Sequence, residues 1–342
     1  MKRRRGGTTI RALARRAGVS PATVSRVLNH APGVTEALRR RVLRVLDQGK
    51  GSRDAVPRVA VRRGTGTLGL IVPDITNPFY AESAKIIIDA CQGRGYTVIL
   101  CNSENLPALH RRQVELLRRR RVDGIIFGSV LLDDDETEAL IAAGYPCIQY
   151  NRRLRSGHGS YVVADNVRAG REVTAHLLGL GHRRIAFIAG TPEASTAHER
   201  LAGYRKALQD AGVEPDDGPV VNGRYQAAEA LRVAEALLKN PQRPTAIIGS
   251  SDAMALSILA AAGEHDVKVP EELSVAGIDD IGIAAHHNIQ LTTVSHHGAE
   301  MAALAARWML EIAQDPARFA REPLQHVIRP TLMIRRTCGA VR

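Results

Sequence analysis

Near its N-terminus the chain contains the run Ala17-Gly18-Val19-Ser20-Pro21-Ala22-Thr23-Val24-Ser25-Arg26-Val27-Leu28-Asn29. Gly18 ends the segment before it, because glycine takes a left-handed helix-terminal conformation without a steric penalty. Ser20 can cap the next segment, and Pro21 stands at the first helical position, where a missing amide hydrogen costs nothing. The run therefore predicts the end of one helix, a short turn, and a second helix from Pro21 to about Asn29.

The sequence on either side of this run supplies two further helices. Thr9 can cap the first, which ends at Ala17, and Thr35 can cap a third that runs to Asp47. Apolar residues recur at helical spacing in all three segments. We expect the shared core to contain Ile10, Leu13, Ala14, Ala17, Val24, Val27, Leu28, Leu38, Val42, Leu43, Val45 and Leu46. This arrangement is typical of the helix-turn-helix, whose second helix enters the major groove of DNA.

The positive charge of the chain is concentrated in the same region. The 342 residues carry a net charge of +12, and residues 1–67 hold 17 Lys and Arg against 3 Asp and Glu. The remaining residues hold 30 against 32 and are nearly neutral. A basic head on a neutral body is the electrostatic footprint of a nucleic-acid-binding module. A basic tail without structure would carry the same charge, but it would not show the helical spacing.

Composition argues against a membrane protein and against a disulfide scaffold. No apolar run approaches the roughly 18 residues that a membrane span needs, and the basic residues 2–5 are not followed by the apolar core of a signal peptide. The cysteines Cys91, Cys101, Cys147 and Cys338 lack metal-ligand or redox spacing. We therefore expect a cytoplasmic protein with plain buried thiols, no metal, no cofactor and no membrane partner.

From Leu68 onward, strand-like apolar runs alternate with helical patterns. Four runs begin at Leu68, Thr97, Gly124 and Cys147, and three more begin at Arg184, Thr245 and Leu273. Helical stretches near 78–93, 107–121 and 133–143 separate the first four. Continuous apolar runs between helices indicate parallel strands covered on both faces. Two such series predict two doubly wound α/β lobes, with a ligand cleft between them at the carboxyl ends of the strands.

The basic head and the two-lobed remainder of the chain, here called the sensor, together resemble the lactose-repressor (LacI/GalR) family of bacterial transcription regulators. In the head the resemblance lies in residues 9–34. In the sensor it lies in residues 71–80 (Ile-Val-Pro-Asp-Ile-Thr-Asn-Pro-Phe-Tyr), 121–126, 181–186, 200–204 (Arg-Leu-Ala-Gly-Tyr), 277–280 (Gly-Ile-Asp-Asp) and 291–294. The family fold that this implies is an all-α helix-turn-helix head plus an α/β two-lobed sensor like that of the periplasmic binding proteins, with two doubly wound parallel sheets.

The resemblance also implies domain boundaries. We expect the helix-turn-helix domain over residues 1–50, a linker or hinge over 51–67, and an effector-binding and dimerisation domain over 68–342. Within that domain the N-lobe is expected at about 68–165 and 296–323. The C-lobe is expected at about 166–293 and 324–340.

By resemblance, the start of the second helix contacts the operator. Pro21, Ala22 and Arg26 would face the floor of the major groove, where Arg26 can bind a guanine through two hydrogen bonds and Ala22 can contact a thymine methyl group. Five polar side chains would hold phosphates and set the register of the head on the duplex rather than select sequence. They are Thr9, Ser20, Thr23, Ser25 and Asn29.

The linker departs from the family pattern. Relatives carry a Leu there that wedges into the minor groove and bends the duplex, and this chain has Ala60 at that position. Gly51, Arg53-Asp54 and Pro57 likewise replace the family's Tyr, Pro-Asn and Ala. Arg58 can still enter a narrow minor groove or bind phosphate. Whether this linker forms a minor-groove hinge helix stays open.

For the sensor, the resemblance implies a polar clamp on a small polyol-like or purine-like molecule. Arg200 and Asp279 would form the clamp, because a guanidinium donates in a planar fork and a carboxylate accepts hydroxyl hydrogen bonds. Weaker candidates are Asp74, Phe79, Asn151, Thr196, Tyr225 and Asp252. Alternatives are an internal ion pair for Arg200, capping for Asp74 and Asp252, and core packing for Phe79. The pairs His286-His287 and His296-His297 are expected at the surface or in a crossover strand rather than on a metal.

These inferences predict a homodimeric regulator, most simply a repressor. Its two heads would occupy half-sites of a pseudo-palindromic operator, and a sugar or related metabolite in the cleft would control operator binding. Nothing after about residue 335 resembles a leucine heptad, which favours a dimer over a tetramer. No nucleophile elbow or Ser/His/Asp set indicates an enzyme, so no catalytic residues are predicted. The alternative is a ligand-binding or sugar-processing protein whose basic head is incidental.

Overall fold

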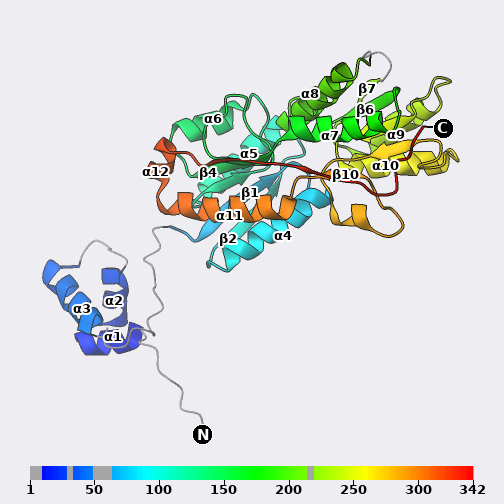
Figure 1. Cartoon of the computed structure of the whole chain (residues 1–342). Coiled ribbons are helices and arrows are strands. Elements are labelled where there is room, and N and C mark those ends of the chain that lie inside the picture. Colours follow the sequence, from blue (N-terminus) through cyan, green and yellow to red (C-terminus); the bar gives the residue numbers. More distant parts are fainter. Residues whose placement is uncertain (1–9, 29–33, 49–63, 214–218, 342) are drawn as a thin grey trace, which may run out of the picture. The chain divides into compact units, whose positions relative to one another are not determined.

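The computed structural model describes residues 10–28, 34–48, 64–213 and 219–341. The chain divides into two compact units, Met1–Gly64 and Thr65–Arg342 (Figure 1). The predicted linker residues Gly51, Arg53, Asp54, Pro57, Arg58 and Ala60 lie outside the described residues, as do Thr9 and Asn29.

The first unit contains the three expected helices. They are α1 (Ile10–Ala17), α2 (Pro21–Leu28) and α3 (Glu36–Gln48). Gly18 has φ +64°, and the amide of Val19 donates to the carbonyl of Ala14 at 3.0 Å. These features confirm the left-handed ending that the sequence predicted. The buried core is Ala14, Ala17, Val24, Val27 and Val42.

The N-lobe of the second unit is built on a six-stranded parallel sheet with the order β11-β5-β4-β3-β1-β2. Its strands are β1 (Thr67–Val72), β2 (Thr97–Asn102), β3 (Ile125–Phe127), β4 (Cys147–Tyr150), β5 (Tyr161–Ala164) and β11 (Gln325–Ile328). Leu70 and Val72 pack in one buried cluster and Ile71 in another, because successive strand residues point to opposite faces. The sheet is therefore covered on both sides, as the apolar runs predicted.

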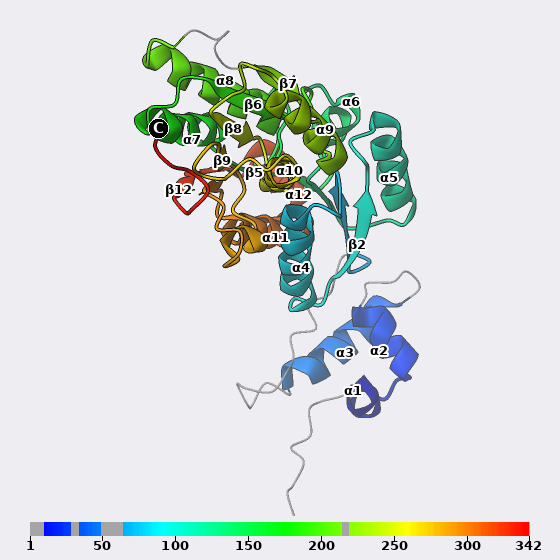
Figure 2. The same ribbon diagram turned by 90° about the vertical axis from the view of Figure 1, so that its right-hand side faces the viewer.

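Helices from distant parts of the chain cover these two faces. On one face lie α4 (Pro78–Gln92) and α11 (Gly298–Gln314), which run side by side (Figure 2). The other face carries α5 (Pro107–Arg119) and α6 (Asp135–Ala142). The short α12 (Pro316–Arg321) follows α11.

The C-lobe repeats the plan with a four-stranded parallel sheet in the order β7-β6-β8-β9. The strands are β6 (Ile185–Ala189), β7 (Val220–Asn222), β8 (Ala246–Gly249) and β9 (Ser274–Ala276). One face packs on α7 (Asn166–Gly179) and α8 (Ser195–Asp210), and the other on α9 (Ala227–Leu238) and α10 (Asp252–Glu264). Two doubly wound lobes are thereby confirmed.

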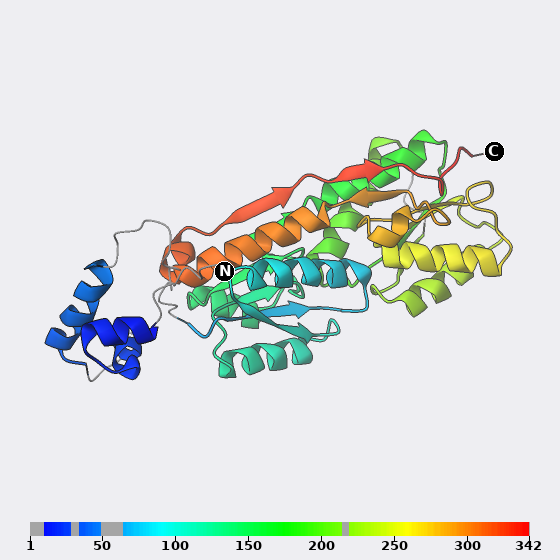
Figure 3. The same cartoon turned by 90° about the horizontal axis from the view of Figure 1, so that it is seen from below.

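The chain crosses between the lobes three times. The first crossing follows β5, the second follows β10 (Thr293–Ser295), and the third precedes β12 (Thr331–Met333), which pairs antiparallel with β10. The C-terminal strands run lengthwise along both lobes (Figure 3). The expectation that the C-lobe begins again at residue 324 is wrong, because β11 pairs with β5 and forms the edge of the N-lobe sheet. The strand is largely exposed and begins with two polar residues, so it does not stand out in the sequence as an apolar run.

Within the described residues, no helix is long and apolar enough to cross a membrane.

Candidate functional site

A narrow cleft, here called the interlobe cleft, lies between the carboxyl ends of the strands of the two lobes. The cavity that it encloses has a volume of about 20 Å³, room for about one water molecule, so a larger ligand enters only if the lobes part. Its lining is Pro73, Asp74, Asn77, Phe79, Tyr80, Asn105, Asn151, Arg152, Thr196, Arg200, Tyr225, Ser251 and Asp279. Seven of the eight side chains predicted for the effector site are among them; Asp252 is the exception.

Arg200 and Asp279 form the predicted pair, and both are almost fully buried, at 2% and 6% exposure. Nη2 of Arg200 donates to Oδ1 of Asp279 at 3.1 Å, Nε donates to the amide oxygen of Asn166 at 2.9 Å, and Nη1 donates to the carbonyl of Ser250. Burial raises the pKa of Asp279 to about 6 against the opposing effect of Arg200. The structure thus shows the internal ion pair that was the alternative for Arg200, which is extensively partnered inside the protein, and the clamp on an effector stays a prediction.

Asp252 lies behind the interlobe cleft rather than in its lining. It has no exposed surface. Oδ1 accepts from the hydroxyl of Thr293 and Oδ2 accepts from the amide of Ile281 at 3.0 Å. Burial, followed by the negative charge of Asp279, raises the pKa of Asp252 to about 7. This corrects the expectation of a direct effector contact, because both oxygens tie the start of α10 to the crossover strand β10 and the loop after β9.

Aromatic side chains form the N-lobe wall of the cleft. Phe79 is 5% exposed and packs edge-on against Tyr80, with ring centroids 5.1 Å apart, and parallel to Tyr150 at 6.2 Å. It both lines the cleft and belongs to the core. The hydroxyl of Tyr80 accepts from Nδ2 of Asn151 at 2.9 Å, while Oδ1 of Asn151 is buried without a hydrogen-bond donor.

On the C-lobe side, Tyr225 and Thr196 are joined by a hydrogen bond. The phenol of Tyr225 donates to the hydroxyl of Thr196 at 3.0 Å. Asp74 stands at the opposite wall, where Oδ1 accepts from both the amide and the hydroxyl of Thr76. The turn-capping alternative for Asp74 is therefore correct, and the half-buried carboxylate still lines the cleft.

Sequence reasoning missed five polar lining residues, which are Asn77, Tyr80, Asn105, Arg152 and Ser251. Arg152 directly follows Asn151 at the end of β4 and is 2% exposed. Its position just beyond the carboxyl end of a parallel strand is a signal that was available in the sequence, because ligands of such sheets bind at that end. The next residue, Arg153, bonds across to the C-lobe through Glu199 at 3.0 Å.

The histidine pairs take two different positions. His286 and His287 are exposed after the short helix η2 (Gly282–Ala285), whereas His296 has no exposed surface. Nη2 of Arg200 lies 3.4 Å from both ring nitrogens of His296, and burial with this cation lowers the pKa of His296 well below its usual value. Among the described residues, no cluster of three or more His, Cys, Asp or Glu can hold a metal ion.

In the helix-turn-helix unit, Ser20, Pro21 and Ala22 are exposed at the start of α2. The hydroxyl of Ser20 accepts from the amide of Thr23 at 3.0 Å and bonds to its hydroxyl at 2.8 Å, so it caps the helix as expected. Ser25 and Arg26 lie within α2, and their side chains are outside the description. The operator contacts of these residues stay predictions.

A helix-turn-helix head with a basic sequence, joined to two α/β lobes around a polar cleft, defines a DNA-binding regulator with a ligand sensor. Residues 9–49 match the model of the bacterial regulatory proteins of the lacI family, and residues 174–338 match a periplasmic binding protein-like domain. The chain is 31% identical over 308 residues to the HTH-type transcriptional repressor PurR of Photobacterium profundum, covering 90% of this chain and 92% of the relative. Catabolite control protein A of Priestia megaterium is 33% identical, with 87% and 90% covered.

Solved structures agree with these relatives. The cellobiose complex of the transcriptional regulator CelR is 31% identical, with a TM-score of 0.70 over 96% of this chain and 99% of that one. A LacI-family regulator from Enterococcus faecium with bound ribose is 26% identical, with a TM-score of 0.70 over 81% and 100%. The chain belongs to the LacI family of bacterial transcription regulators, and its relatives are regulators rather than enzymes.

Proposed function

We propose that this chain is a homodimeric repressor that works in the cytoplasm, and that a sugar or related metabolite in the interlobe cleft controls its hold on operator DNA. The observation that carries the effector site is the convergence of seven predicted side chains, drawn from both lobes, on one buried cleft. Relatives named as repressors support the output, and the cellobiose and ribose complexes of similar proteins support the effector class.

The mechanism follows from the position of the cleft. Because its walls belong to different lobes, a bound molecule that contacts both stabilises one angle between them. The lobes would pass that angle to the linkers, and a coupling free energy of about 1–3 kcal/mol changes operator affinity by about 5–150-fold. The polar side chains of the lining that would bind hydroxyls are Asp74, Asn151, Thr196, Tyr225, Arg200 and Asp279.

Selection of DNA sites from a random pool at about 0.15 M salt tests the regulator. Salt is held constant because phosphate contacts make affinity strongly salt-dependent. An enriched inverted repeat is expected, with the bound species sedimenting at twice the mass of the chain. Recovery of DNA without an enriched sequence would favour the other candidate, a ligand-binding protein whose head makes only phosphate contacts.

Substitution of Arg26 gives the matched control for that selection. Arg26→Ala is expected to lose preference at one base pair of each half-site, because a bidentate contact with guanine contributes about 1–3 kcal/mol of discrimination. Arg15→Ala removes the same charge from an exposed position on α1 and should weaken binding equally for all sequences. Equal loss of preference in both variants would contradict the assignment of Arg26.

A further inference from the structure

We propose that the effector carries an anionic group, a phosphate or a carboxylate, and that Arg152 binds it. This inference rests on the proposed effector site and specifies the chemistry of its occupant. It starts from the side chain of Arg152, which lines the interlobe cleft and is 2% exposed.

The guanidinium of Arg152 lies over the ring of Tyr225, 5.6 Å from the ring centroid, but the protein satisfies its hydrogen-bonding groups only in part. Nη1 donates to the amide oxygen of Asn105 at 2.7 Å, while Nε is buried without an acceptor. Among the described residues, no carboxylate oxygen lies within 4.0 Å of this guanidinium. A buried cation without a countercharge is costly, because desolvation is not offset by a partner.

Other arginines in and near the cleft do have carboxylate partners, so the lack of one is particular to Arg152. Arg153 pairs with Glu199 at 3.0 Å and Arg155 pairs with Asp133 at 2.9 Å. Arg200, which is equally buried, has Asp279 and two further oxygen acceptors. Of these four arginines, only Arg152 lacks a carboxylate partner.

The charges of the cleft sum to zero, but Arg152 and Asp74 are the two that have no ion partner among the described residues. Its lining contains two arginines and two aspartates. Asp279 is bonded to Arg200, and Asp74 is half-exposed and bonded to Thr76. Hydroxyls of a neutral sugar would supply acceptors but no charge, whereas a phosphate or carboxylate supplies both and matches the guanidinium fork with two hydrogen bonds.

Matched pairs of ligands test the inference on the full-length protein in phosphate-free buffer at constant ionic strength. The probes are D-ribose with D-ribose 5-phosphate, D-glucose with D-glucose 6-phosphate and D-gluconate, and inorganic phosphate alone. We expect the anionic members to bind at least about tenfold more tightly than their neutral parents, as one charge-assisted hydrogen bond provides. Stronger binding of the phosphates or of gluconate identifies which anion the site takes.

Variants distinguish a specific contact of Arg152 with the anion from a general effect of positive charge. Arg152→Gln should remove the preference for the anion, Arg152→Lys should keep part of it, and Arg155→Gln, an exposed arginine three residues away, should leave it unchanged. Arg152→Gln should also melt at the same or a higher temperature without ligand, because it removes an unmatched buried charge; a large decrease in melting temperature would show a structural role and overturn the inference.

Two results overturn the proposal in different ways. If a neutral sugar binds as tightly as its anionic partner and changes operator affinity, the anionic effector is wrong while the proposed function stands. If neither anions nor neutral sugars bind and no operator is selected, both are wrong. Failure of every anion, inorganic phosphate included, to bind in an Arg152-dependent way also overturns the anionic effector.

Discussion

Buried charged groups near the interlobe cleft differ in how completely the protein satisfies them. Arg200 donates to three oxygens and Asp252 accepts at both of its own, so these two residues are part of the structural frame. Arg152 and the amide oxygen of Asn151 keep unused hydrogen-bonding groups. At the residue scale, polar groups without a partner mark positions where a ligand can bind without displacing an internal contact, and fully bonded groups mark those that also hold the lobe together.

Asp252 should make the stability of the sensor depend on pH. Its folded-state pKa is raised to about 7, mainly by burial, above the unfolded value near 4. The folded state therefore binds the proton more tightly, so this stabilisation is complete below about pH 4 and is lost as pH rises toward 7. Between pH 4 and 7 this loss of unfolding free energy is on the order of 3 kcal/mol. Asp252→Asn should remove it, so that the unfolding free energy depends less on pH in this range. Urea unfolding at several pH values measures it, and an unchanged slope would contradict the assignment.

Two helices of the C-lobe, α7 and α8, approach each other closely and so position Arg200. A Cβ atom added at Gly203 of α8 would lie 2.0 Å from the carbonyl of Val167, and one added at Gly170 of α7 would lie 2.0 Å from the carbonyl of Arg200. Both obstacles are backbone atoms, which cannot rotate away. At the element scale, these glycines set the distance between the helices.

Gly203→Ala should therefore push α8 away from α7. We expect a loss of unfolding free energy of about 1–3 kcal/mol, as for other overpacked interiors, together with weaker effector binding because Arg200 moves with the helix. Gly179→Ala is the matched control, since nothing lies within 4 Å of its added Cβ at the end of α7. Thermal unfolding and ligand titration of both variants would show equal effects if the close approach were unimportant.

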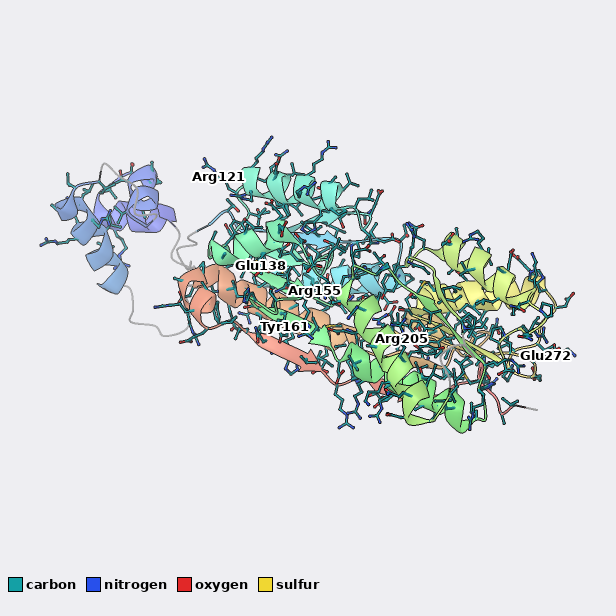
Figure 4. The ribbon with its side chains drawn as sticks, turned by 90° about the horizontal axis from the view of Figure 1, so that it is seen from above. Arg121, Glu138, Arg155, Tyr161, Arg205 and Glu272 are labelled. Atoms are coloured by element: carbon teal, nitrogen blue, oxygen red, sulfur yellow. The ribbon has the colours of Figure 1, made fainter. Side chains whose placement is uncertain are left out.

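Direct contacts also join the two lobes next to residues that line the cleft. Arg153 bonds to Ser195 through its amide at 3.0 Å and to Glu199 through its guanidinium at 3.0 Å, and the amide of Leu132 donates to the carbonyl of Glu193 at 2.7 Å. Figure 4 shows residues of both lobes, with Arg155 and Glu138 in the first and Arg205 and Glu272 in the second. At the scale of the whole sensor, these bonds hold the lobes closed over a cleft of about 20 Å³.

Glu199→Gln should shift the sensor toward an open arrangement. The pair is partly exposed, so its loss is expected to contribute only about 1 kcal/mol, about a fivefold change in population. Hydrogen–deuterium exchange of residues 130–156 should accelerate, with the amides of Leu132 and Arg153 changing most. Glu172→Gln, which breaks an ion pair within α7, should leave this exchange unchanged; matching acceleration in both would argue against the interlobe role.

Local sequence was sufficient for the helices, most strands and the two-lobed plan. Gly18 and Ser20 set the helix-turn-helix turn through backbone conformation and capping, and apolar runs such as residues 68–72 mark buried parallel strands, because both effects act within a few residues. Resemblance then named eight effector-site residues, of which seven line the cleft. The sequence did not reveal that β11 closes the N-lobe sheet, that Asp252 is fully bonded behind the cleft, or that Arg152 is buried without a carboxylate. Those facts depend on pairings between residues far apart in the chain, and only the tertiary structure determines which charges find partners and which remain for a ligand.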